Sequence, residues 1–76
     1  MAEKKLREIE FMVFCIENLA SRLQIHPRDA YDLMARKTNL LQTYIMPSYD
    51  VLHTQDKEYI VNDIIEALKL KGMAVA

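Results

Sequence analysis

Apolar residues recur through the first third of the chain at alternating steps of three and four residues. This spacing places them on one side of an α-helix, and it predicts a helix from residue 3 to about residue 24 with one broad buried stripe. The charged residues between them fall on the opposite, solvated side. The expected stripe consists of Leu6, Ile9, Met12, Val13, Ile16, Leu19, Ala20 and Leu23.

Phe11 and Phe14 depart from this pattern. At about 100° per residue, both side chains point roughly 140 to 160° away from Ile16, onto the side that should be exposed. Two interpretations are open. Either the C-terminal helix or the middle of the chain covers the two rings, or the rings form a docking surface for another protein. The two phenylalanines are therefore the candidate partner-binding residues.

The middle of the chain predicts two short helices. Pro27 suits the first turn of a helix and opens a segment that runs to about residue 37, and Thr38 and Asn39 mark a break. A short apolar helix follows from residue 40 to about residue 46, where a proline ends it. The residues of the first short helix that we expect to be buried are Ala30, Tyr31, Leu33 and Met34.

The segment 47–55, PSYDVLHTQ, lacks periodicity and predicts a turn or a single helical turn, after which Thr54 is the expected N-cap of a second long helix. Gly72 is expected to end that helix, with residues 73–76 as a frayed tail. The fold class is thus all-α: one domain over residues 1–76, a small bundle of about four helices with the long ones at both ends. The expected stripe of the last helix is Ile60, Val61, Ile64, Ile65 and Leu68.

Charge and cysteine content narrow the function classes. Ten Lys and Arg against eleven Asp and Glu give a formal net charge of -1, which argues against nucleic-acid and membrane binding. The single cysteine, Cys15, has no disulfide partner and fits a reducing compartment, so a cytoplasmic protein is expected. No segment approaches the roughly 20 apolar residues of a membrane span, and Glu10 and Glu17 interrupt the apolar run that a signal peptide would need.

Side chains suited to catalysis are sparse. Asp50 and His53, with Glu58 and Asp63 nearby in the sequence, suggest a metal or acid–base cluster, but a zinc site needs three or four well-placed ligands. The preferred interpretation is structural: Asp50 accepts backbone hydrogen bonds in a turn, and His53 makes a buried or half-buried polar contact. Cys15 is expected to pack in the core. We therefore expect neither an enzyme nor a cofactor or metal site.

Residues 27–46 also fit a helix-turn-helix, two short helices joined by a tight turn. A recognition helix needs basic or amide side chains that face DNA, yet no Lys or Arg occurs between Lys37 and Lys57. The sequence therefore favours a non-enzymatic helical module that binds itself or another protein, with a DNA-binding regulator as the alternative.

Two stretches, FMVFCIENLA and YDVLHTQDKEYIVNDI, resemble a small bacterial family of unknown function, domain-of-unknown-function family three-seven-nine-one, over nearly the whole chain. No established activity comes with the family. Its members resemble small companions encoded beside larger proteins, some similar to ADP-ribosyltransferase-type toxins, so the resemblance implies an antitoxin-like or accessory role. Its signature residues, expected to be structural, are Tyr49, Asp50, His53, Thr54, Gln55, Glu58, Tyr59 and Asp63.

Overall fold

The computed structural model describes the backbone of residues 2–73 and the side chains of residues 5–73. Its elements, in chain order, are α1 (Ala2–Leu23), α2 (Pro27–Tyr31), η1 (Asp32–Lys37), η2 (Leu41–Ile45), α3 (Tyr49–Leu52) and α4 (Lys57–Leu70). Every one of these elements is helical, and the described residues contain no strand, so the all-α class is confirmed. The same residues contain no helix with the length and apolar character that crossing a membrane requires.

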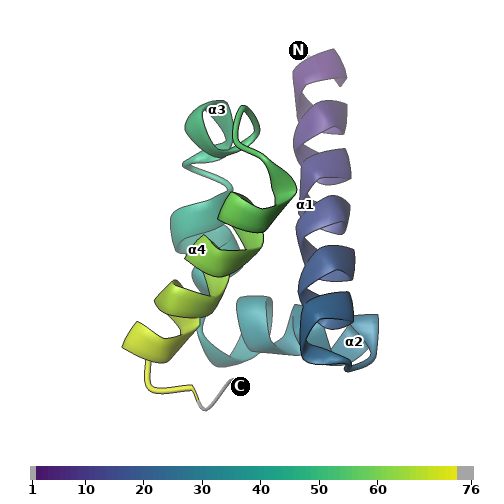
Figure 1. Cartoon of the computed structure of the whole chain (residues 1–76). Coiled ribbons are helices and arrows are strands. Elements are labelled where there is room, and N and C mark those ends of the chain that lie inside the picture. Colours follow the sequence, from purple (N-terminus) through teal and green to yellow (C-terminus); the bar gives the residue numbers. More distant parts are fainter. Residues whose placement is uncertain (1, 74–76) are drawn as a thin grey trace.

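The two long helices lie side by side, as Figure 1 shows, with the short helical segments around them. α2 packs against the C-terminal end of α1, and α3 lies beside the N-terminal half of α1. The core forms where α1, α2, η1, η2 and α4 meet, and burial of its apolar side chains stabilises the fold. Its members are Cys15, Leu19, Ala20, Ala30, Met34, Ala35, Leu40, Leu41, Ile45, Ile60, Val61, Ile64 and Leu68.

Two residues in the left-handed region turn the chain between its elements. Gln24 has a φ of 56° at the end of α1, and Asn39 has a φ of 57° between η1 and η2. After Gln24, the amide of Ile25 donates to the Ala20 carbonyl at 2.9 Å, which closes the end of α1. His26 then caps α2, because its Nδ1 accepts from the amide of Arg28 at 3.1 Å.

The break at Thr38 is confirmed, and the hydroxyl of this buried residue explains it. The Thr38 Oγ1 donates to the Leu33 carbonyl at 2.7 Å and accepts from the Leu40 amide at 3.3 Å. One side chain therefore satisfies backbone groups on both sides of the break.

The predicted short helices are present, and parts of them are π-helical. η1 continues directly from α2, and both η1 and η2 are π-helical. In η2 the amide of Met46 donates to the carbonyl of Leu41 at 3.0 Å, a step of five residues instead of four. This wider turn still buries Leu41 and Ile45 together, so the apolar pattern was compatible with either helix type.

Several local expectations were wrong. Asp56, not Thr54, caps α4: its carboxylate accepts from the Tyr59 amide at 2.8 Å, whereas the Thr54 hydroxyl donates back to the Val51 carbonyl at 2.7 Å. Tyr31 is exposed instead of buried, because it lies on the outer side of α2 while Ala30 faces the core. Leu33 is only half-buried.

The C-terminal residues 73–76 were expected to form a frayed tail, and this is wrong for Met73. Residues 74–76 lie outside the described residues, but Met73 packs against the core. Its amide donates to the Leu68 carbonyl at 3.0 Å, and Gly72 makes this bend with a φ of 86°. Gly72 ends α4 as the sequence predicts.

Candidate protein-interaction surfaces

The N-terminal half of α1 exposes apolar side chains that were expected to be buried. Leu6 is 57% exposed, Ile9 43% and Val13 45%, whereas Leu19 and Ala20 on the same helix are buried. α2 has only five residues and lies at the C-terminal end of α1, so it covers this side of the helix only there. The prediction that the apolar stripe of α1 is buried is therefore wrong for Leu6, Ile9 and Val13.

Leu6, Ile9 and Val13 are spaced by three and four residues and lie on one face of α1; we call them the α1 stripe. Exposed Lys5 and Glu10 lie on opposite flanks, each about 70° from the centre of this face. A contiguous apolar face with a charged border is typical of a surface that binds another protein.

The two phenylalanines form an aromatic cluster with α3. Their rings stack with centroids 6.1 Å apart, and the rings of Phe11 and Tyr49 meet edge to face with centroids 5.4 Å apart. Tyr49 in turn stacks on His53 at 4.5 Å. Phe11 is half-buried, so the middle of the chain covers it, while Phe14 remains 36% exposed. The docking role of the pair stays a prediction.

The family-signature run around α3 is held by local hydrogen bonds. The Nδ1 of His53 lies 2.7 Å from the Tyr49 carbonyl, so this side chain makes a polar contact, but it is exposed, not half-buried as expected. Asp50 is exposed in the first turn of α3 and, within residues 5–73, accepts no hydrogen bond, so the expected turn contact was wrong. Gln55 and Tyr59 are also exposed.

The acidic residues considered for a metal cluster point to different partners. Glu58 forms an ion pair with Arg22 at 3.7 Å, and Asp63 accepts a hydrogen bond from the Tyr44 hydroxyl. No three His, Cys, Asp or Glu side chains lie together in a way that could hold a metal ion, within the part of the chain that the structure describes.

Cys15 packs in the core, as the sequence predicts. Burial disfavours the thiolate and raises the pKa of this thiol to about 12. Its thiol therefore stays protonated and unreactive at neutral pH.

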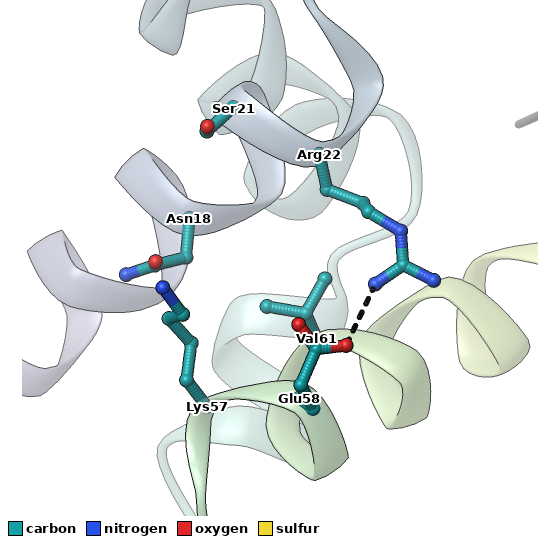
Figure 2. A pocket seen from close by; sticks show the side chains of 6 residues that line it. All are labelled: Asn18, Ser21, Arg22, Lys57, Glu58 and Val61. Atoms are coloured by element: carbon teal, nitrogen blue, oxygen red, sulfur yellow. Dashed lines mark ion pairs between the residues drawn. The ribbon is translucent and has the colours of Figure 1, made fainter.

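A hollow between α1 and α4 is polar and small, about 130 Å³. Figure 2 shows Asn18, Ser21 and Arg22 of α1 facing Lys57, Glu58 and Val61 at the start of α4. Arg22 spans it with two contacts, the ion pair with Glu58 and a hydrogen bond of 2.7 Å to the Asn62 amide oxygen. The charges of Arg22 and Glu58 therefore have partners within the chain. We interpret the hollow as part of the structural contact between the two long helices.

A larger groove of about 430 Å³ runs between η2 and α4. Its apolar lining includes Leu70, which is 88% exposed, and its polar border includes Asp63, Glu66 and Lys71. The Tyr44 hydroxyl donates to Asp63 at 2.5 Å across the groove wall, and this hydrogen bond, followed by burial, raises the pKa of Tyr44 to about 12. We call it the η2–α4 groove, lined by Leu40, Thr43, Tyr44, Asp63, Glu66, Ala67, Leu70 and Lys71.

The η2–α4 groove was not predicted from the sequence. One signal was available, because Leu70 lies on α4 but outside its buried stripe. The contact between Tyr44 and Asp63, 19 residues apart, had no signal in the spacing of the sequence.

The segment considered as a helix-turn-helix uses its second helix for the core. η2 has the sequence LQTYI, without Lys or Arg, and buries Leu41 and Ile45. Arg36 of η1 pairs with Asp32 at 3.8 Å. Nothing in the described part of this segment favours the DNA-binding alternative.

Together these features define a small all-α domain that presents an apolar helix face and an apolar groove. The sequence model of DUF3791, described as a protein of unknown function, matches residues 10–71. The chain belongs to this family, and the match includes the aromatic cluster and the η2–α4 groove, while Leu6 and Ile9 precede it. No curated protein and no solved structure matches the chain.

Proposed function

We propose that this chain is a helical protein-interaction domain that binds another protein surface through the α1 stripe. The observation that carries the proposal is the exposure of Leu6, Ile9 and Val13, between 43% and 57%, in one helical register. Burial of apolar surface is favourable by about 25 cal/mol per Å². A partner that covers the stripe therefore stabilises the complex in the same way as α2 stabilises the other end of α1.

The function we propose is non-enzymatic, and the state of the reactive groups supports this. Cys15 is buried with a raised pKa, so its thiol is a poor nucleophile. Glu58 and Asp63 are each engaged by a side chain of the same domain. These groups contribute to stability, which leaves the surface of α1 for recognition.

The biological setting that we propose is an accessory role beside a larger, neighbour-encoded protein, of the antitoxin-like kind that the family resemblance implies. A cytoplasmic location accompanies this proposal, because a free, buried thiol suits a reducing compartment. In this setting the partner is either that neighbouring protein or a second copy of the chain.

Two matched valine variants test the proposal. Val13 lies in the α1 stripe. Val51 is also an exposed valine within a helix, but it lies on α3. Val13→Glu is expected to abolish association, and Val51→Glu is expected to leave it unchanged, because only the first places a charge in the interface. Multi-angle light scattering of the purified chain, alone and co-expressed with neighbour-encoded proteins, measures both.

The same experiment has a clear negative outcome. A wild-type chain that stays monomeric and co-purifies with none of those proteins contradicts the proposal. So does a Val13→Glu variant that associates as strongly as the wild type.

A further inference from the structure

The α1 stripe and the η2–α4 groove are both apolar, and one projects from a helix while the other is recessed. The stripe presents three apolar side chains at positions i, i+3 and i+7 of a helix, which is the spacing of the anchors that a helix inserts into an apolar groove. The groove has a volume of about 430 Å³, within the range of pockets that bury a drug-sized ligand. One surface is a row of exposed apolar side chains, and the other is a cavity with a partly apolar lining.

The charges beside the two surfaces also match. The residues of α4 that line the groove are Asp63, Ala67 and Leu70, with Glu66 on one flank and Lys71 on the other, each about 70° from the centre of this face. When two helices pack antiparallel, their corresponding flanks face each other. That orientation places Lys5 on the side of Glu66, and Glu10 on the side of Lys71.

Other ways of covering the stripe with itself are less favourable. An antiparallel pair of stripes brings Glu10 of one copy to Glu10 of the other, and like charges repel. In a parallel pair, the two copies of α2, which packs against the C-terminal end of α1, lie at the same level and are expected to crowd the contact.

We infer that the α1 stripe of one copy binds antiparallel to α4 in the η2–α4 groove of a second copy. This inference rests on the proposed function, and it names the partner as the chain itself. Stripe and groove are different surfaces, so the contact is head-to-tail. Each added copy leaves one free stripe and one free groove, and assembly continues with concentration until a ring closes.

A mixing experiment tests this arrangement. Ile9→Glu removes the stripe, and the double variant Thr43→Glu, Leu70→Glu fills the groove with charge at two exposed positions. In sedimentation velocity, wild type is expected to form concentration-dependent oligomers, and each variant alone is expected to remain monomeric. A 1:1 mixture of the variants restores one intact stripe and one intact groove, and is expected to form a heterodimer. Circular dichroism melting checks that each variant is folded.

Charge reversal provides a second measurement that does not touch the apolar residues. Lys5→Glu and Glu66→Lys are each expected to weaken self-association roughly two- to fivefold, the usual scale of an exposed ion pair. The chain that carries both substitutions restores an opposite-charge pair in reversed order, and is expected to recover most of the lost affinity.

The failures of the inference and of the proposed function are distinct. If the groove variant associates as wild type while Ile9→Glu is monomeric, the stripe has another occupant, which overturns the inference and leaves the proposed function intact. If the wild type is monomeric at every concentration but captures a neighbour-encoded protein through Val13, the inference is again overturned and the proposed function stays intact. If neither stripe variant changes any association, both fall.

Discussion

The rings of Phe11 and Tyr49 meet edge to face with centroids 5.4 Å apart, and this contact joins α3 to α1 across 38 residues of sequence. α3 has only four residues and buries Leu52 alone, so little else fixes it. The pair also decides which of the two phenylalanines stays accessible, because Tyr49 covers Phe11 and leaves Phe14 at the surface.

Tyr49→Ala is therefore expected to destabilise the domain. An edge-to-face aromatic pair contributes about 0.5 to 1.5 kcal/mol beyond the area it buries. In a domain of this size a loss of 1 kcal/mol lowers the melting temperature by about 4 to 8 °C. Thermal unfolding followed by circular dichroism measures it, and Tyr59→Ala, at an exposed tyrosine of α4, serves as the control. Equal melting temperatures for the two variants would show that the Phe11 contact contributes nothing.

A second prediction concerns the start of α4. Asp56→Ala removes the side chain that accepts from the Tyr59 amide, and loss of an N-cap costs about 0.5 to 2 kcal/mol. Thr54→Ala removes only a hydrogen bond of an exposed hydroxyl to the Val51 carbonyl, so a change within about 0.5 kcal/mol is expected. Urea unfolding of both variants gives the two values. The reverse order would mean that Thr54 is the functional cap.

The cap of α4 is an example of a local feature that the sequence pattern does not determine. Thr54 and Asp56 are both good N-cap residues, and which one caps α4 depends on where the backbone turns after α3. The same limit applies to Leu41 and Ile45, whose four-residue spacing fits an α-turn or a π-turn equally well.

The long helices and the break at Thr38 could be predicted, because periodicity and local hydrogen bonding determine them. The two candidate surfaces, the α1 stripe and the η2–α4 groove, could not be predicted from the sequence. Periodicity identifies the apolar side of α1, but whether Leu6 is covered depends on the length of α2 and on where it packs. The η2–α4 groove combines residues 40–44 with residues 63–71, a relation that exists only in three dimensions.

Alkaline pH is expected to weaken the fold through two groups. Burial raises the pKa of Cys15 from 9.0 to about 12, and the Asp63 hydrogen bond raises that of Tyr44 from 10.0 to about 12. Each group releases its proton more readily in the unfolded chain. Their contributions are therefore complete below pH 9 and are lost as the pH rises towards 12.

Tyr44→Phe separates the two contributions. The variant keeps the ring but loses the hydrogen bond to Asp63, which is expected to cost about 1 kcal/mol at neutral pH. It should also lose less stability than wild type between pH 10 and 12, because of the two groups with a raised pKa only Cys15 remains in the variant. Urea unfolding across this pH range tests both points, with Tyr31→Phe at an exposed position as the control. Parallel pH profiles for wild type and Tyr44→Phe would refute the role of this hydrogen bond.

The last prediction concerns the turn at the end of α1, where Gln24 has a φ of 56°. This left-handed conformation is unfavourable for a residue with a Cβ, while glycine adopts it without strain. Gln24→Gly is therefore expected to stabilise the domain by about 0.5 to 1 kcal/mol, after the greater entropy of glycine in the unfolded chain is subtracted.

Glu17→Gly, at an exposed position inside α1, provides a control of opposite sign and is expected to destabilise by about 1 kcal/mol. Urea unfolding of the two variants beside wild type measures both changes. If Gln24→Gly is destabilising as well, the left-handed turn is not what ends α1. The hydrogen bond from the Ile25 amide to the Ala20 carbonyl would then have to form with another backbone geometry at residue 24.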